Sequence, residues 1–296
     1  MAALGMTVAM PAQAAQRGAV HELSGTVADA DFWTPENMRA ATPLDGPLQT
    51  AGGALDQPTA GSPSLVPPVG PSNPGSSWTG GGKVSRTSGR VFFLFHGARA
   101  SCSANAVTSD NRSVVMTAGH CVKYQGSWHT DWVFVPGYRN GNAPYGKWTA
   151  KETLTTPQWE ASEDLTYDVG AAVVNPLGGR RLTDVVGAQG IAFNQARLQR
   201  TYSFGYPAES PFDGTKLIYC SGTALVDPVI SKDNVLRCDM TGGSSGGPWL
   251  VNFDPESGTG VQNSVNSFGY GFLPGYLLGP YFGSDAQALY QRAAAS

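Results

Sequence analysis

The sequence predicts an all-β protein, and three observations carry that prediction. Glycine and proline number 38 and 21 among 296 residues, and both are poor residues for helix interiors. Hydrophobic residues make up 41% of the chain and aromatic residues 10%, which argues against disorder of the whole chain. Beyond residue 83, short β-branched or aromatic runs recur without helical periodicity between them. A sandwich or barrel of short strands fits this pattern.

The predicted strands lie in seven runs, most of them bounded by turn residues: 91–95, 113–117, 131–135, 169–174, 201–204, 216–219 and 248–251. One helix is expected at the end of the chain, where Ser284 and Gln287 have the spacing of a capping box. Apolar residues then recur at helical intervals, at Ala286, Leu289, Tyr290 and Ala293.

The first 82 residues differ in composition from the rest. An apolar run over residues 2–10 and the small-residue pattern Ala12-Gln13-Ala14 predict a partial signal peptide over residues 1–14, although no basic residue precedes Arg17. Residues 15–82 are expected to form a pro-region and a linker. Thr34 and Pro35 predict a helix start, with the helix ending near residue 41.

The linker is predicted from Pro43 to Gly82, where the chain holds eight Pro and nine Gly but no Lys or Arg. We expect this leader to be removed during maturation, and Arg86 and Arg90 are candidate junctions. The alternative is a permanent disordered tail.

Charge and cysteine usage exclude several classes of protein. The net charge of −3 and the pI of about 5.8 give no basic footprint for nucleic acid, so no such partner is expected. No run of eighteen apolar residues is present, so no membrane-spanning helix is expected. The four cysteines include no C-x-x-C pair, so neither a metal nor a cofactor is predicted. We expect a monomer.

The string GGSSGGP over residues 242–248 is the most informative part of the sequence. Its glycines permit backbone conformations closed to other residues, and their amides are uncluttered by side chains. The predicted strand over residues 249–251 would hold the loop in place. Taken alone, such a loop is more often a turn or a linker than the site of a nucleophile, here Ser245.

A nucleophilic serine needs a base, because its hydroxyl is a poor nucleophile at neutral pH. Of the four histidines, His120 stands just after a predicted strand and beside Cys121, which would anchor its backbone. The base in turn needs an acceptor for its other ring nitrogen. Asp168, at the start of an apolar strand, fits that role, and Asp164 is the alternative.

Chain order discriminates between folds. Residues 243–247 formally satisfy G-x-S-x-G, but an α/β-hydrolase needs a histidine after the serine, and none follows His129. A subtilisin-type order needs an acid before His120 in an α/β body, and the helical segments for that are absent. The order His120, Asp168, Ser245 is that of a chymotrypsin-like double barrel.

Two motifs carry a resemblance to a known family. The TAGHC of residues 117–121 resembles the histidine motif of trypsin-like serine peptidases, and the GSSGGP of residues 243–248 resembles their serine motif. Three further stretches resemble the secreted microbial branch that includes glutamyl endopeptidases: 134–138, 144–148 and 167–168. Residues 32–39 resemble pro-regions of bacterial members, and the whole resemblance covers most of residues 78–290.

The resemblance implies an all-β architecture of two six-stranded antiparallel β-barrels, over residues 83–190 and 191–296, with a short C-terminal helix. In the cleft between them, Ser245 would attack the scissile carbonyl of a polypeptide substrate. His120 would take the proton of Ser245 and later give it to the leaving amine, while Asp168 orients the imidazole. The backbone N–H groups of Gly243 and Ser245 would bind the developing oxyanion.

Resemblance and proximity also imply the disulfides Cys102–Cys121 and Cys220–Cys238, one of the three pairings that four cysteines allow. Disulfides suit an extracellular location, so we expect a secreted protein. Ser244 stands where many animal members carry an aspartate that pairs with a new N-terminus. We therefore expect leader removal to unblock the cleft, or the leader to assist folding, rather than a switch of the oxyanion hole.

Substrate preference stays open. Asp239 lies six residues before the nucleophile, where trypsin-like enzymes carry the acid that selects Arg or Lys, yet the microbial branch often has an acid there without that preference. No histidine in the second half supports a preference for glutamate. Residues 267–269 (Ser267, Phe268, Gly269) resemble the strand that pairs with the substrate backbone. The competing functions are a catalytically silent binding protein on the same fold and a serine esterase with the same three residues.

Overall fold

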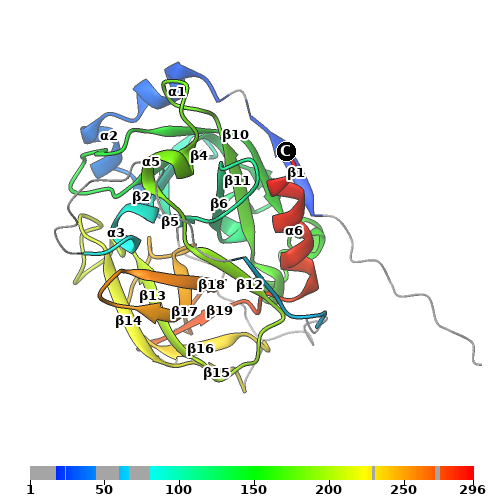
Figure 1. Cartoon of the computed structure of the whole chain (residues 1–296). Coiled ribbons are helices and arrows are strands. Elements are labelled where there is room, and N and C mark those ends of the chain that lie inside the picture. Colours follow the sequence, from blue (N-terminus) through cyan, green and yellow to red (C-terminus); the bar gives the residue numbers. More distant parts are fainter. Residues whose placement is uncertain (1–17, 24, 45–59, 67–80, 229–230, 271–273) are drawn as a thin grey trace, which may run out of the picture.

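The computed structural model describes residues 18–23, 25–44, 60–66, 81–228, 231–270 and 274–296. The predicted signal peptide and most of the predicted linker lie outside these residues. Within them the chain is mostly β, which confirms the predicted fold class. The strands form two halves, one above the other in Figure 1.

The first half is a closed six-stranded antiparallel barrel. Its strands are β4 (Ser88–Phe95), β5 (Ala98–Ala106), β6 (Val114–Thr117), β9 (Thr130–Pro136), β10 (Trp148–Thr155) and β11 (Gly170–Val174). They pair in the order β10-β11-β6-β5-β4-β9, and the barrel closes where Trp148 of β10 pairs with Phe134 of β9. Fully buried apolar side chains, among them Val91 and Leu154, fill its interior, so the burial of apolar surface holds the barrel together.

The described residues of the second half form two sheets, so the predicted second closed barrel is not shown. One sheet has the order β14-β13-β17-β18-β12-β3. These strands are β3 (Ser64–Val66), β12 (Gly190–Phe193), β13 (Arg200–Gly205), β14 (Ile218–Thr223), β17 (Pro248–Asp254) and β18 (Thr259–Val265). The other sheet contains β15 (Leu225–Val226), β16 (Asn234–Arg237) and β19 (Tyr276–Gly279).

One disulfide and two backbone hydrogen bonds, rather than a continuous ladder of strand pairing, join these two sheets. Cys220 on β14 is disulfide-bonded to Cys238, directly after β16. Two backbone hydrogen bonds connect the segment after β18 to β19, from Ser267 N to Leu278 O (2.9 Å) and from Leu278 N to Phe268 O (2.8 Å). A disulfide and a short backbone pairing therefore connect the two sheets.

The predicted C-terminal helix is α6 (Ser284–Ala294), and it packs mainly on β10 and β11 of the first half, with a smaller contact to β12 of the second half (Figure 1). Its apolar residues are buried, as their spacing predicts, in a core that the first barrel shares with residues of the second half such as Phe193. The predicted capping box is wrong, because Gly283 is the N-cap and no side chain caps the helix. Gln287 instead accepts a hydrogen bond from Asn194 Nδ2 (3.0 Å).

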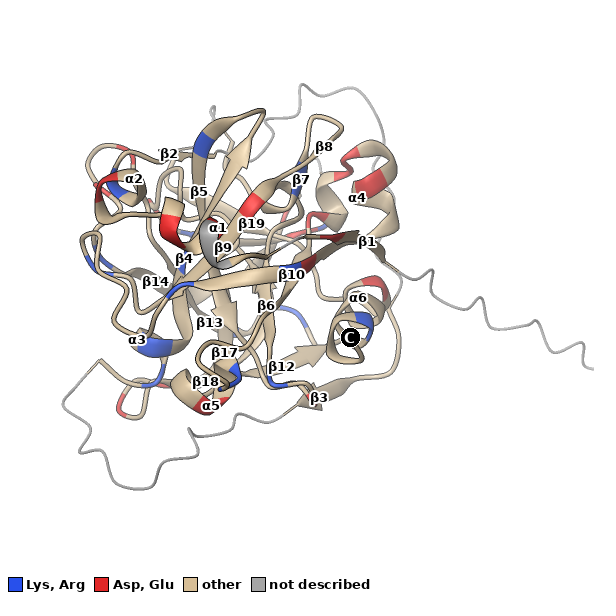
Figure 2. Ribbon diagram, turned by 90° about the horizontal axis from the view of Figure 1, so that it is seen from above, with Lys and Arg blue, Asp and Glu red and all other residues tan. Residues whose placement is uncertain are grey.

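Short elements connect the strands: α3 (Val84–Thr87), η1 (Gly119–Cys121), β7 (Lys123–Tyr124), β8 (Ser127–Trp128), α4 (Pro157–Ser162), η2 (Leu165–Tyr167) and α5 (Leu182–Val186). None of the described helices has the length and apolar character needed to cross a membrane. Charged residues of both signs are scattered over many elements (Figure 2).

The described residues of 18–44, part of the predicted pro-region, are built into the first half (blue in Figure 1). Strand β1 (Ala19–Glu22) pairs with β10, and β2 (Thr42–Pro43) pairs with β5. Between them lie α1 (Val27–Phe32) and the predicted helix, α2 (Pro35–Arg39), whose N-cap is Thr34. Trp33 anchors the segment, because its fully buried ring packs on Phe92 and its Nε1 donates to Asp131 O (2.9 Å).

Arg90 cannot be a junction in the folded chain. Its side chain is 2% exposed in the middle of β4, and its guanidinium donates to Ser101 Oγ and to Gly214 O (3.3 Å). A peptidase would reach this bond only after β4 had left the barrel. Arg86, which is half-buried in α3, remains a candidate.

Candidate active site

His120 lies in a tight turn between β6 and β7. The turn is tied to β5 by the disulfide between Cys121 and Cys102, the pairing that the resemblance implies. Gly119 is needed for the close packing here, because a Cβ at this position would lie 2.8 Å from the ring of Trp159 and 2.9 Å from Asp168 Oδ1. The turn thus brings the backbone of His120 against the carboxylate of Asp168.

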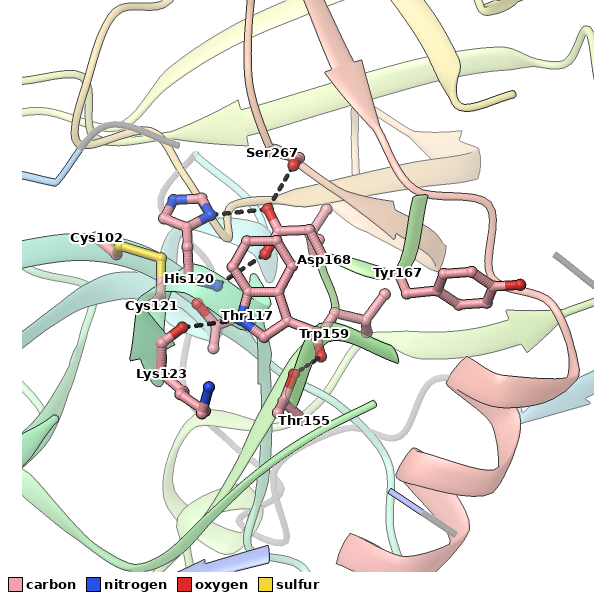
Figure 3. A network of polar contacts seen from close by, with 12 residues as sticks. Cys102, Thr117, His120, Cys121, Lys123, Thr155, Trp159, Tyr167, Asp168 and Ser267 are labelled. Atoms are coloured by element: carbon pink, nitrogen blue, oxygen red, sulfur yellow. Dashed lines mark hydrogen bonds and ion pairs between the residues drawn. A yellow bond between two sulfur atoms is a disulfide. The ribbon is translucent and has the colours of Figure 1, made fainter. Parts of the chain in front are cut away.

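Asp168 contacts His120 at two points (Figure 3). Its Oδ1 accepts the backbone N–H of His120 (2.7 Å), and its Oδ2 lies 2.7 Å from His120 Nδ1. Ser267 Oγ donates to the same Oδ2. The side chains of His120 and Asp168 are both fully buried. Since Nδ1 donates to the carboxylate, the neutral ring presents a lone pair at Nε2.

The chain on both sides of Asp168 is also fixed. Thr156 Oγ1 donates to Tyr167 O (2.7 Å), and Thr155 Oγ1 donates to Val169 O (2.9 Å). The alternative acid, Asp164, instead caps η2 by accepting from Thr166 N (3.0 Å). Of the two carboxylates, the structure therefore pairs Asp168 with the histidine.

Three ring N–H groups that sequence reasoning did not identify hold the carbonyls of this turn. His129 Nε2 donates to His120 O (2.9 Å), Trp132 Nε1 to Cys121 O (3.0 Å) and Trp159 Nε1 to Lys123 O (2.8 Å). His129 is buried and stacks on Phe93, with ring centroids 4.3 Å apart. Burial lowers the pKa of His129 to about 3, so this ring stays neutral at physiological pH. Nothing in the local sequence signals these contacts.

The loop that carries Ser245 presents two backbone N–H groups. Gly243 has φ of +91°, which favours glycine, and a Cβ there would lie 2.9 Å from Tyr206 O. The preceding carbonyl, Gly242 O, accepts from Ala208 N (2.7 Å). Because C=O and N–H point in opposite directions across a trans peptide, the N–H of Gly243 points away from Ala208. Among the described residues, no protein group accepts from the N–H of Gly243 or of Ser245.

Ser103, on β5 of the first barrel, holds this loop from the opposite half. Its N–H donates to Ser245 O (2.7 Å), and its Oγ donates to Gly243 O (2.8 Å) while accepting from Tyr206 N (2.8 Å). Ser103 is 1% exposed. One residue therefore fixes the carbonyls of both residues whose N–H groups are predicted to bind an oxyanion.

Ser245 and His120 are not hydrogen-bonded to each other in this structure. Ser245 is 5% exposed, and the buried His120 Nε2 has no partner among the described residues. Such contacts often tighten only when substrate binds. Ser244, which stands where animal members carry an aspartate, donates through Oγ to Thr241 O (2.8 Å) within its own loop.

A cavity of about 500 Å³ lies beside Ser245. Its walls come from Glu209 and from residues 238–242, 244–245, 267–270 and 274–277. They include all the predicted substrate-binding residues, Asp239, Ser267, Phe268 and Gly269. Asp239 and Glu209 are the charged residues among the described lining, and neither Lys, Arg nor His occurs there. No described residue of 18–44 lines the cavity.

The described residues contain one group of His, Cys, Asp and Glu side chains close enough to share a metal ion. The group consists of Cys102, His120 and Cys121, whose ligand atoms lie within 4.8 Å of one another. Both sulfurs belong to a disulfide, so neither is a thiolate. A catalytic zinc needs three protein ligands, and only His120 remains. These residues do not fit a metal centre.

The fold and the site together indicate the class of protein to which the chain belongs, the serine peptidases. The features that indicate it are the closed β-barrel, the second β half and the histidine–aspartate pair beside the serine loop. No family model matches the chain, but solved structures do, and the chain belongs to the chymotrypsin-like serine peptidases, resembling their microbial branch. The protease Anisep from Arthrobacter nicotinovorans is 47% identical, with a TM-score of 0.68 over 71% of this chain and 96% of Anisep. The thermostable serine protease AL20 from an extremophilic microorganism is 43% identical, with a TM-score of 0.68 over 72% of this chain and 99% of AL20.

Two more distant proteins complete the comparison. A Glu endopeptidase is 17% identical, with a TM-score of 0.57 over 77% of this chain and all of that structure, and it shows a shared fold alone. An extracellular metalloprotease of Bacillus subtilis is 27% identical over 160 residues, which cover 53% of this chain. The chain spans about half the length of this curated relative.

Proposed function

We propose that the chain is a secreted serine endopeptidase that hydrolyses peptide bonds through Ser245, His120 and Asp168. The observation that carries this proposal is the double contact between Asp168 and His120, at Nδ1 and at the backbone N–H, both at 2.7 Å. A carboxylate in this position fixes the tautomer of the imidazole and stabilises the imidazolium that forms when it takes a proton.

In the proposed reaction, His120 Nε2 takes the proton of Ser245 Oγ as the oxygen attacks the scissile carbonyl carbon. The resulting imidazolium donates that proton to the leaving amine, and an acyl-enzyme is formed. Water then enters, gives a proton to His120 and attacks the ester carbon, and His120 returns that proton to Ser245 Oγ as the acid product is released. Asp168 stays ionised throughout, held by the N–H groups of His120 and the hydroxyl of Ser267.

The N–H groups of Gly243 and Ser245 would bind the negative oxygen of both tetrahedral intermediates. Support comes from the orientation of the Gly242–Gly243 peptide and from the absence of a protein acceptor for either group among the described residues. Each donor of this kind contributes roughly 10²–10³-fold to the rate in serine peptidases. Secretion is supported by the two disulfides, which persist in oxidising compartments.

A fluorophosphonate reacts only with an activated serine, so it tests the proposal directly. We expect a single adduct, located by mass spectrometry on Ser245, and loss of both adduct and peptide hydrolysis in Ser245→Ala. The exposed Ser221 of β14 provides the control, and Ser221→Ala should keep both. An adduct elsewhere, or peptide hydrolysis by Ser245→Ala, would contradict the proposal. Hydrolysis of small esters without cleavage of peptides would favour an esterase, and an intact serine without any adduct would favour a silent binding protein.

Metal-dependent hydrolysis is the second activity to test, because a curated relative bears the name of a metalloprotease. We expect activity to survive dialysis against a chelator, since the described residues offer His120 but no further ligand for a catalytic zinc. Loss of activity that zinc restores would overturn this expectation.

A further inference from the structure

Asn266 lies between β18 and Ser267, and its amide is wholly engaged in the interior. The residue is 0% exposed. Its Oδ1 accepts from Ser203 Oγ (2.6 Å) and from Trp249 Nε1 (2.7 Å), and its Nδ2 donates to Phe204 O and to Ser244 O, each at 2.9 Å. Both ends of the amide thus have two partners.

The chemistry of these partners fixes the orientation of the amide. The indole N–H of Trp249 can only donate, so it must face the oxygen of Asn266. Two backbone carbonyls can only accept, so they must face the nitrogen. Turning the amide over would break all of these contacts, and a single orientation results.

The main chain of Asn266 contacts the same loop. Its N–H donates to Gly247 O (2.8 Å), and its carbonyl accepts from Gly246 N (2.7 Å). A Cβ on Gly247 would lie 2.8 Å from Asn266 Nδ2 and 2.0 Å from Phe204 O. The glycine two positions after Ser245 therefore leaves room for the approach of Asn266.

The contact with Ser244 bears on catalysis through the geometry of one peptide bond. Ser244 O accepts from Asn266 Nδ2 and from Gly247 N (3.0 Å). The Ser244–Ser245 peptide is trans, so its N–H points away from the side where Asn266 holds its carbonyl. That N–H belongs to Ser245 and makes no hydrogen bond with any residue that the structure describes.

We propose that Asn266 is a positioning residue for the oxyanion hole, because its amide holds the carbonyl of Ser244 and so aims the N–H of Ser245 at the reacting carbonyl oxygen. This inference rests on the proposed function. The segment directly after β18 would then support the site at two points, because Ser267, the residue next to Asn266, donates to Asp168. Two consecutive residues would thus support the oxyanion donor and the acid of the same site.

Asn266→Asp tests the proposal with little change of shape, because a carboxylate cannot donate to Ser244 O. We expect kcat to fall by about 10–100-fold, less than or comparable to outright removal of an oxyanion donor, while KM changes by less than about threefold. A peptide aldehyde forms a tetrahedral adduct that uses the same hole, so its inhibition constant should rise in parallel with the loss of kcat/KM. The concentration of folded, reactive enzyme in each sample, which is needed to calculate kcat, is measured as the final extent of fluorophosphonate labelling.

Ser203→Ala is the matched control. It removes the hydroxyl that donates to Asn266 Oδ1, in the same buried network, but leaves both amide donors in place. We expect a loss of thermal stability with kcat and aldehyde affinity close to those of the parent. Asn266→Leu, of similar volume and without donors, is the second variant in case the aspartate does not fold, and it should show the same fall in kcat.

The outcomes separate this inference from the proposed function. Peptide hydrolysis by Ser245→Ala would overturn both. If Ser245→Ala is inactive but the Asn266 variants keep the parent kcat and aldehyde affinity, only the role of Asn266 fails. An equal fall of kcat in Ser203→Ala would also overturn it, because the effect would then belong to the network as a whole.

Discussion

The hydroxyl of Ser103 donates to the carbonyl of Gly243, across 140 residues of sequence and from one half of the molecule to the other. The same residue holds Ser245 O through its backbone N–H. The first barrel, which supplies His120 and Asp168, therefore also fixes the loop that carries the serine. The relative position of base and nucleophile depends on this contact between halves.

Ser103→Ala should lower both stability and turnover. It leaves Gly243 O and Tyr206 N buried without the hydroxyl that serves both, which costs about 1–3 kcal/mol of the free energy of unfolding. We expect kcat to fall by about 10-fold, less than removal of an oxyanion donor. Urea unfolding and steady-state kinetics measure the two effects. Ser264→Ala is the control, because it removes another buried hydroxyl that donates to a backbone carbonyl. We expect this variant to lose stability but to keep the kcat of the parent. Equal losses of kcat in Ser103→Ala and Ser264→Ala would contradict the prediction.

His129 should make the fold sensitive to acid. Burial lowers its pKa from 6.5 to about 3, so the unfolded chain binds a proton at His129 below pH 6.5 that the folded chain refuses. The stability that follows from this difference is complete above pH 6.5 and is lost progressively as the pH falls toward 3. Between pH 7 and pH 5 the loss should be about 2 kcal/mol from this residue.

His129→Gln isolates that effect, because glutamine can donate to His120 O but does not titrate. Urea unfolding at pH 7 and pH 5 should show the parent losing about 2 kcal/mol more than the variant. Other groups titrate in both proteins and cancel in the comparison. Equal losses in the two proteins would show that His129 does not contribute to acid sensitivity.

The cavity beside Ser245 should prefer a cationic side chain before the scissile bond. Asp239 and Glu209 line it, and no basic residue does so among the described residues. We expect peptides with Arg or Lys at this position to have the highest kcat/KM, and Asp239→Asn to lower that value by about 10–100-fold, equivalent to roughly 1.4–2.7 kcal/mol.

A library of peptides that differ only in this residue measures the preference. Glu256→Gln removes one negative charge in an exposed turn outside the lining and controls for net charge. If Asp239→Asn and Glu256→Gln behave alike, or if the parent prefers glutamate, the acidic cavity does not select the substrate.

Trp33 should contribute several kcal/mol to the stability of the full chain. Its ring is fully buried against Phe92, and replacing a buried Trp by Ala costs about 3–5 kcal/mol. Urea unfolding followed by circular dichroism should show this loss for Trp33→Ala, whereas the neighbouring Phe32, 40% exposed, should lose less than about 1 kcal/mol on the same change. Equal effects would mean that residues 18–44 do not dock through Trp33.

The strands were predicted from runs of β-branched and aromatic residues. This pattern correctly located strands that contain such runs, for example β4 and β9. It fails for β5, whose sequence ARASCSANA is composed mainly of small and polar residues without β propensity. The side chains from Ala100 to Ala106 are buried all the same, because β5 lies between β4 and β6 and places Ser103 in contact with the other half. Burial by neighbouring strands overrides local preference.

The sequence by itself determined the chemistry of the candidate site, because each motif is local. The TAGHC and GGSSGGP strings place the histidine and the serine within a few residues of the glycines and the cysteine that shape their turns. Tertiary structure alone decided which groups hold those turns. Ser103, His129 and Asn266 act through hydrogen bonds to backbone carbonyls, and any residue supplies such a carbonyl. Because every residue has the same backbone carbonyl, the sequence does not indicate which side chain will donate to it. The donor can be identified only in the folded structure, where packing brings it within about 3 Å of the carbonyl oxygen.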